Sequence, residues 1–280
     1  MRLALGLIAA FMLVEVAAGL IAGSLALLSD AAHMLTDAAA LALALVAARL
    51  AARPAAGAFT FGLKRAEILS AQVNGGALGA LGLVIAVDGV RRLFDPPSVD
   101  GEIVVAVGVL GALVNVAAAA ALARGSKRSL NVEGARMHVM ADLFASLGAV
   151  AAGLLVLFAD FDRADPLAAL LVAALMLRSA WMLLRESGRV LLEAAPRGMD
   201  VQEIGEALAG QAGVVEVHDL HVWEVTSGFP ALAAHVVVEP DDDCHATRRV
   251  LQRMLDERFG LEHVTLQVDH ASRGGLLEIE

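Results

Sequence analysis

The sequence of 280 residues contains a single cysteine, Cys244, so no disulfide can form within the chain. Such cysteine usage is typical of a segment that faces a reducing compartment. A basic excess is also missing, because 31 acidic residues outnumber 21 lysines and arginines. This balance disfavours nucleic acid as a partner, since affinity for phosphates comes from clustered cations. No cleavable signal peptide is evident, and we expect the long N-terminal apolar run to be retained as a helix.

Apolar residues are abundant instead, at 58% of the chain, and the mean hydropathy is +0.70. These values are typical of a membrane protein. Charge is divided unevenly: residues 1–192 carry 15 Lys and Arg against 14 Asp and Glu, whereas residues 193–280 carry 6 against 17. We predict a six-helix transmembrane domain over residues 1–192 and a small acidic domain, cytoplasmic, over residues 193–280.

Six apolar runs are each close to the roughly 20 residues that a helix needs to cross about 30 Å of hydrocarbon. Glycine, proline and polar residues separate the runs. Lysines and arginines gather in alternate connections, which by the positive-inside rule places both termini in the cytoplasm, although Arg91 and Arg92 count against this orientation. We therefore predict a multi-pass α-helical membrane protein. The six runs cover residues 3–23, 27–50, 66–91, 102–123, 132–159 and 166–191.

After Pro196 the hydrophobic period changes, and the pattern predicts a small α+β domain. Its expected element order is α-β-β-α-β. Asp243 precedes the second helix and is the expected N-cap. The helices are predicted over residues 200–211 and 244–259, and the strands over residues 218–225, 231–239 and 262–269.

Two pairs of ionisable residues lie inside the apolar runs: His33 with Asp37, and His138 with Asp142. A charged side chain at membrane depth costs about 2.5–3.5 kcal/mol or more, so such residues are functional candidates. Residues four apart share one helix face, and each pair therefore aims at one point. Two such helices facing each other would offer two imidazoles and two carboxyl groups, a set that suits four-coordinate Zn²⁺. We call these four residues the tetrad.

The charges of the tetrad suggest how transport could be driven. Zn²⁺ with two carboxylates and two neutral imidazoles sums to zero, whereas the ligands without metal should take up protons. Competition of metal and protons for one site is what an antiporter requires. The alternative is that each pair packs or hydrogen-bonds between helices. Two pairs with the same spacing at matched depth favour the metal site over this alternative.

Residues 23–37, GSLALLSDAAHMLTD, resemble the cation diffusion facilitator family, in its zinc-transporter branch. The resemblance continues through residues 61–69, 131–142, 218–223 and 234–236. It implies six transmembrane helices, a metallochaperone-like cytoplasmic domain, a homodimer, and efflux of Zn²⁺ from the cytosol in exchange for H⁺. In the family, histidine at the position of His33 goes with zinc preference. Ligand chemistry by itself leaves Cd²⁺, Co²⁺ and Fe²⁺ open.

Three features differ from many relatives. The connection over residues 53–64 holds no His, Asp, Glu or Cys, so we expect no peripheral metal site there. The connection over residues 125–128 is a short turn without a histidine-rich stretch, and no histidine-rich leader precedes the first run. We expect a minimal bacterial member of the family, in the inner (plasma) membrane.

The resemblance also implies metal ligands at His218, His235 and Asp269 in the cytoplasmic domain. Gln267 stands where some members have another ligand, which disfavours a second metal there. Zinc is then the transported substrate and also a candidate regulatory ion. We read the acidic run before His245 as a capped helix start rather than a metal site. Further candidate ligands in this domain are His221, His263 and His270.

Three other polar residues lie within the membrane spans: Glu15, Asn74 and Asp88. They either line an access path for the metal or relay protons, or they form hydrogen bonds between helices, which is the role that we prefer.

Two other functions compete with antiport. A membrane-embedded metalloenzyme is disfavoured, because the chain has no His-Glu-x-x-His and four protein ligands leave no open catalytic position. We therefore expect no enzymatic activity. A membrane-bound metal sensor or storage protein without flux is the remaining alternative, and it would leave the buried tetrad without a purpose.

Overall fold

The computed structural model describes residues 2–123 and 130–271. The chain forms two compact units, one made of residues 1–44 and 73–184, the other of residues 45–72 and 185–280. The predicted short turn over residues 125–128 lies outside the described residues.

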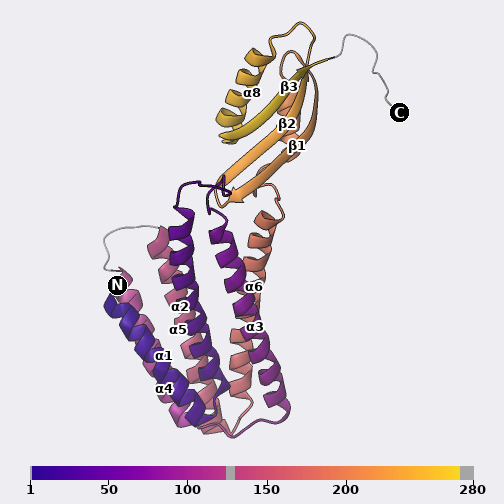
Figure 1. Cartoon of the computed structure of the whole chain (residues 1–280). Helices are drawn as coiled ribbons and strands as arrows, with labels where there is room; N and C mark the ends of the chain where they lie inside the picture. The colour runs from indigo at the N-terminus through magenta and orange to yellow at the C-terminus, as the bar shows by residue number, and fades with distance from the viewer. Residues whose placement is uncertain (1, 124–129, 272–280) are drawn as a thin grey trace. The chain divides into compact units, whose positions relative to one another are not determined.

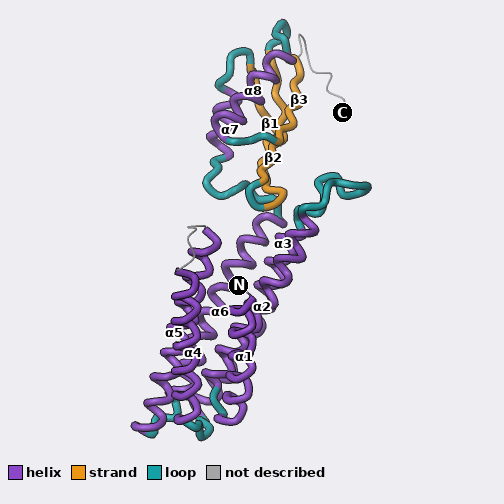
Figure 2. The backbone as a smooth tube through the Cα atoms, turned by 90° about the vertical axis from the view of Figure 1, so that its left-hand side faces the viewer, coloured by secondary structure: helices purple, strands orange, loops and turns teal. Residues whose placement is uncertain are grey.

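Six long helices account for the apolar runs (Figures 1 and 2). Four of them contain a stretch long and apolar enough to span a membrane: α2, α3, α6 and the Asp142–Ala159 part of α5. The described parts of α1 and α4 hold shorter apolar helices, Ala10–Ala22 and Gly101–Ala117. The predicted helical membrane fold is confirmed. The bounds are α1 Arg2–Ala22, α2 Leu25–Ala51, α3 Ala66–Phe94, α4 Gly101–Ala123, α5 Leu130–Ala159 and α6 Ala164–Leu191.

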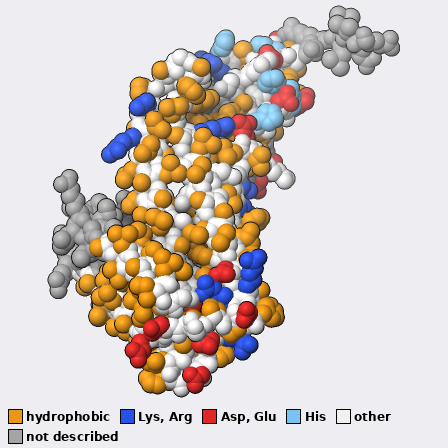
Figure 3. All heavy atoms as spheres, turned by 60° about the horizontal axis from the view of Figure 1, so that its bottom comes forward, with side chains coloured by type: hydrophobic (Ala, Val, Ile, Leu, Met, Phe, Trp, Pro, Cys, Tyr) orange, Lys and Arg blue, Asp and Glu red, His pale blue; other side chains and the backbone are white. Residues whose placement is uncertain are grey.

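Small side chains let α4 and α5 pack closely. A Cβ atom added at Gly108 would lie 2.8 Å from a methyl carbon of Val150, and one at Gly153 would lie 2.9 Å from a methyl carbon of Val105. Packing through small residues is the usual means of helix association in lipid, where water supplies no hydrophobic driving force between helices. Large apolar side chains instead face outward, as on α1, where Leu20 is 68% exposed, and they cover much of the helical surface in Figure 3.

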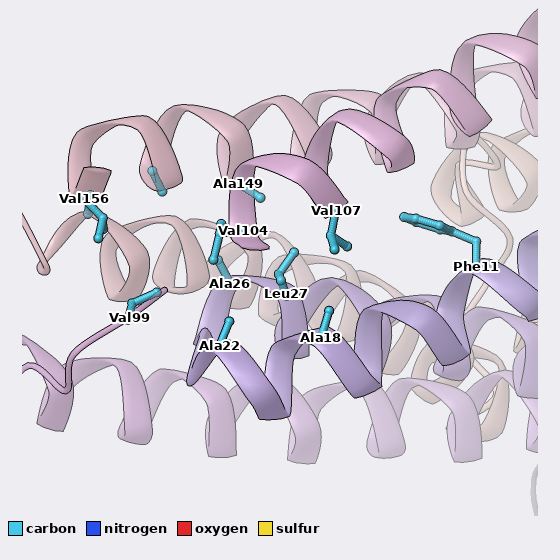
Figure 4. Packing of buried hydrophobic residues seen from close by; sticks show 12 residues of the cluster. Phe11, Ala18, Ala22, Ala26, Leu27, Val99, Val104, Val107, Ala149 and Val156 are labelled. Atoms are coloured by element: carbon cyan, nitrogen blue, oxygen red, sulfur yellow. The ribbon is translucent and has the colours of Figure 1, made fainter. Parts of the chain in front are cut away.

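A buried cluster joins α1, α2, α4 and α5 (Figure 4). Phe11, Ala18 and Ala22 form one stripe of α1 at helical spacing, and they pack with Leu27 of α2 and Val107 of α4. All of these side chains are at most 9% exposed. The cluster holds the first half of α2, which carries His33 and Asp37, against its neighbours.

The turn between α1 and α2 is fixed by polar contacts from three other segments. Gly23 has φ of +68°, a left-handed conformation that glycine adopts without strain. Its carbonyl oxygen accepts a hydrogen bond from Arg92 of α3 at 2.6 Å, and the Ala22 oxygen accepts one from the Asp100 amide at 3.1 Å. The carboxyl group of Asp165, in the first turn of α6, accepts hydrogen bonds from the Leu25 amide at 2.7 Å and from the Ser24 hydroxyl. The start of α2 is therefore anchored.

The C-terminal domain has the predicted α-β-β-α-β order. Its sheet has the order β1-β2-β3, with β1 antiparallel and β3 parallel to the central strand. Strand β1 starts four residues before the predicted position, because bulges allow it to stay paired with β2 from Val214 onward. The bounds are α7 Val201–Ala209, β1 Val214–Thr226, β2 Phe229–Val238, α8 Cys244–Phe259 and β3 His263–His270.

One face of this sheet is covered by both helices. The buried residues of β2 alternate, and Leu232, Val236 and Val238 pack with Ile204 of α7 and Leu251 of α8. Because successive strand residues point to opposite faces, the intervening side chains of β2 lie on the face away from the two helices. This is the face that carries His235.

Candidate metal sites

The tetrad residues of α2 lie close together. His33 and Asp37 are one turn apart, with 3.6 Å between the His33 Nε2 and the Asp37 Oδ2. Their side chains are only 23% and 30% exposed. An imidazole and a carboxyl group that meet at this depth in a membrane-spanning helix can share either a proton or a metal ion.

The tetrad residues of α5 are described only in part. Asp142 is 9% exposed, and its backbone oxygen accepts the Ser146 hydroxyl at 3.0 Å. The Ser146 oxygen in turn accepts a long bond of 3.4 Å from Asn115 of α4. His138 lies within α5, but its side chain is outside the described residues.

The described part of the chain contains one group of three or more potential metal ligands whose atoms all lie within 4.8 Å of one another, and that group lies in the C-terminal domain. The ligand atoms of His33, Asp37 and Asp142 therefore do not all lie within this distance of one another. Two ligands of one Zn²⁺ lie at most about 4.4 Å apart, twice the metal–ligand distance. Metal binding at the tetrad thus requires α2 and α5 side chains to come closer, and the tetrad stays a prediction.

The group of suitable ligands that the described residues do contain lies in the C-terminal domain. It comprises His218, Asp219 and His235, whose candidate ligand atoms all lie within 4.8 Å of one another. His218 of β1 and His235 of β2 are paired directly across the antiparallel ladder, and their rings are 5.2 Å apart between centroids. Histidines and acidic side chains also gather at this domain in Figure 3. We call this group the sheet cluster.

Asp219 belongs to the sheet cluster although it is not among the ligands predicted from the sequence. Its Oδ2 lies 3.4 Å from the Nδ1 of His218 and 3.6 Å from the Nδ1 of His235. In a regular strand, adjacent residues would point to opposite faces. The ladder is irregular between His218 and His221, and Asp219 has φ of +50°. Asp is among the residues that tolerate this left-handed conformation, which brings its carboxyl group to the side of its neighbour.

Asp269 is not part of the sheet cluster. It lies on β3 opposite Val237, two residues after Gln267, which pairs with His235. The Oδ2 of Asp269 accepts a hydrogen bond of 2.9 Å from the Gln267 side chain. Both residues share the exposed face of the sheet with His235, and the role of Asp269 as a ligand stays a prediction.

The acidic run before α8 caps that helix, as predicted. The Asp243 carboxyl group accepts hydrogen bonds from the amides of Ala246 and His245, each at 3.0 Å. These bonds, foremost that of Ala246, together with the nearby charge of Arg249, lower the pKa of Asp243. The ring of His270 has its Nε2 2.9 Å from the Asp242 oxygen. These contacts give the run a structural role.

Two polar residues within the spans have defined partners: Glu15 meets a residue of another helix, as preferred above, whereas the partner of Asp88 lies on its own helix. Asp88 forms an ion pair of 3.0 Å with Arg92 on its own helix rather than with a neighbouring helix. Glu15 of α1 is 1% exposed, and its side chain contacts that of Asp30 of α2, which is 3% exposed. Asp30 lies inside residues 23–37, the motif that carries the family resemblance. An acidic residue in an apolar run is the feature of the sequence by which it could have been recognised as a candidate functional residue.

Comparison with known proteins assigns both parts of the chain. Residues 1–192 match the model of the cation efflux transmembrane domain, and residues 196–271 match that of the cation efflux protein cytoplasmic domain. A solved structure of the metal-bound C-terminal domain of the CzcD transporter from Cupriavidus metallidurans is 33% identical over 25% of this chain and 99% of that one, with a TM-score of 0.25.

Bacterial relatives match nearly the whole chain. The zinc transporter ZitB of Escherichia coli is 40% identical over 95% of this chain and 86% of its own length. The metal cation efflux system protein CzcD of Cupriavidus metallidurans is 38% identical over 97% and 86%. A cadmium, cobalt and zinc/H(+)-K(+) antiporter of Bacillus subtilis is 38% identical over 94% and 86%. The resemblance found in the sequence is thereby confirmed, and the chain belongs to the cation efflux, or cation diffusion facilitator, family of membrane transporters.

Proposed function

We propose that this protein exports divalent zinc from the cytosol in exchange for protons, through a site made by His33, Asp37, His138 and Asp142. The observation that carries the proposal is the His33–Asp37 pair, which lies 3.6 Å apart on a membrane-spanning helix. One relative that is 40% identical is named as a zinc transporter, and another that is 38% identical is named as a cadmium, cobalt and zinc antiporter. Cd²⁺ and Co²⁺ are the further cations that the same ligands would accept.

Exchange follows from the charges of the tetrad. With metal bound, two carboxylates and two neutral imidazoles balance Zn²⁺. Without metal, the two carboxylates would leave uncompensated charge at a depth where it costs several kcal/mol, roughly 2.5–3.5 each. Protons taken up by the imidazoles and carboxyl groups reduce that charge, and the next metal ion displaces them. One site that holds either metal or protons couples the two fluxes.

The remaining parts of the chain support this role. We place both termini in the cytoplasm of a bacterial cell, with residues 1–192 as the transport domain and residues 193–280 as a regulatory domain that holds two copies together as a homodimer. We further propose that the sheet cluster binds a regulatory metal ion, because it offers two imidazoles and a carboxyl group on the uncovered face of the sheet. Asp269 is a candidate for a fourth ligand, because it lies on the adjacent strand and on the same face as His235.

The test is flux in proteoliposomes that carry an imposed pH gradient, read with a zinc dye and a pH dye together. Wild type should move zinc and protons in opposite directions, and Asp37→Asn and Asp142→Asn should abolish both movements. Glu102→Gln is the matched control, since Glu102 is exposed in the first turn of α4. Zinc movement that ignores the pH gradient would overturn proton exchange, and unchanged flux in both variants would overturn the tetrad.

The sheet cluster also favours a second candidate function, a membrane-bound metal sensor or store without flux. That function predicts tight zinc binding by folded wild type and no zinc movement for any tested metal. The proteoliposome experiment separates the two candidates directly.

A further inference from the structure

Two acidic side chains on different helices are buried together near the tetrad. Glu15 of α1 is 1% exposed and Asp30 of α2 is 3% exposed. Glu15 follows Phe11 by four residues and precedes Ala18 by three, so it lies on the buried stripe of α1 that Figure 4 shows. Asp30 follows Leu27 by three residues and extends the matching stripe of α2. Neither residue is needed to bind metal in the proposed tetrad.

The two carboxyl groups face each other without a donor. They are in hydrogen-bonding contact, yet no donor among the described residues reaches the Glu15 Oε2 or the Asp30 Oδ1. The charged group that acts on both is Asp142 of α5, which is also acidic. Helix α4, which packs against α1, has no charged residue between Glu102 and its end at Ala123. The described surroundings therefore supply negative charge and no cation.

Such a pair must hold a cation. Two like charges in contact repel far more strongly at a buried site than in water, and burial adds the cost of removing both from water. One proton placed between the carboxyl groups removes one charge and makes a strong charge-assisted hydrogen bond. A divalent metal ion would need further ligands, and Glu15, Asp30 and Asp142 do not form a group with ligand atoms within 4.8 Å in the described part of the chain.

We propose that Glu15 and Asp30 form a proton-binding pair coupled to the transport site through the charge of Asp142. The inference rests on the proposed exchange of zinc for protons and adds a place where an exchanged proton resides. While Asp142 carries its charge, it favours a proton on the neighbouring pair. Zinc bound at the tetrad neutralises that charge, which weakens the hold of the pair on its proton. Metal binding thus releases a proton from residues that do not ligate the metal.

The test counts the protons that zinc binding releases. Zinc is titrated calorimetrically into the full chain in detergent, in buffers of different ionisation enthalpy, for wild type, Glu15→Gln and Asp30→Asn. Asp88→Asn is the matched control, because Asp88 is an acidic residue of α3 already paired with Arg92. We expect the first two variants to bind zinc while releasing about one proton fewer than wild type, and the control to release as many as wild type. Equal release in all four proteins overturns the pair.

An infrared measurement keeps the pair testable if a variant does not fold and separates its failure from that of the proposed function. Wild type without zinc, at neutral pH, should show the C=O stretch of protonated carboxyl groups, which zinc should diminish and which Glu15→Gln should weaken relative to wild type. Absence of this band in wild type overturns the pair without any variant. If the band is present but zinc releases no protons and leaves it unchanged, proton exchange and the coupling both fail, while a proton on the pair is retained.

Discussion

Replacing Asp165 tests whether the start of α2 depends on α6. The Asp165 carboxyl group accepts from the amides of Leu25 and Ala26, at 2.7 and 3.3 Å, and from the Ser24 hydroxyl. The Leu27 amide donates to the Ser24 oxygen at 3.2 Å, so the first amides of α2 are all satisfied. Leu25, Ala26 and Ser24 are at most 6% exposed, which keeps water from replacing the lost acceptor.

The expected cost follows from those contacts. Each buried donor left without a partner costs about 1–3 kcal/mol. Asp165→Ala strands two amides, and we expect the free energy of unfolding to fall by about 4 kcal/mol, the middle of the range of about 2–6 kcal/mol for two donors. Asp165→Asn keeps one acceptor oxygen and should cost about 1 kcal/mol, the value of a typical cap.

The assay is reversible unfolding of the purified protein in mixed detergent, followed by far-ultraviolet circular dichroism. Glu102→Ala is the control: it also removes a carboxyl group from the first turn of a helix, but an exposed one, and should change stability by at most about 0.5 kcal/mol. Since α2 carries His33 and Asp37, zinc affinity should fall with Asp165→Ala and not with the control. Equal stability of Asp165→Ala and the control would refute the reasoning.

Three further predictions concern other parts of the chain. Asp219→Asn should weaken zinc binding at the sheet cluster by roughly tenfold or more, because asparagine tolerates the left-handed backbone conformation of residue 219 but lacks the negative charge. Competition with a chromophoric chelator measures the zinc affinity. Gly108→Ala should destabilise the protein by about 1–3 kcal/mol, since the added Cβ would lie 2.8 Å from a side chain of α5. Gly148→Ala is the control and should not destabilise the protein, because no atom lies within 4 Å of its added Cβ. Thermal unfolding of the two variants and wild type measures the difference. The pKa of Asp243 is lowered in the folded protein, foremost by the hydrogen bond from the Ala246 amide. The stability that this cap contributes is therefore present above the pKa of the unfolded state and is lost as the pH falls through the pKa of the folded state. Hydrogen exchange at the start of α8 should become faster over this pH range in wild type, and should not change with pH in this way in Asp243→Asn.

Local pattern was sufficient for the secondary structure. Apolar runs near the length of a membrane span predicted all six long helices, because backbone groups in lipid must be satisfied within the helix itself. Strand alternation and the Asp243 cap likewise predicted the order of the C-terminal domain, whose core depends on period-two and period-3.6 patterns. The His33–Asp37 contact was predictable for the same reason, since both residues lie on one helix one turn apart.

Contacts between elements were beyond that pattern. Asp219 was overlooked because a bulge changes which face a strand residue points to, and the bulge arises from pairing with β2. Asp165 and Asp30 read in the sequence as ordinary acidic residues in or beside apolar runs. Their roles depend on a partner more than 100 residues away for Asp165, and on another helix for Asp30.

By itself, the sequence determined that the chain crosses a membrane, where its helices lie, and that His33 and Asp37 are paired by helical spacing, since these depend on composition and on the geometry of one helix. Only the tertiary structure decided that α6 caps α2, that Glu15 meets Asp30, and that Asp219 joins two histidines. Each of these requires side chains from segments that are distant in sequence to be brought within hydrogen-bonding reach, and helix packing and strand register set those distances.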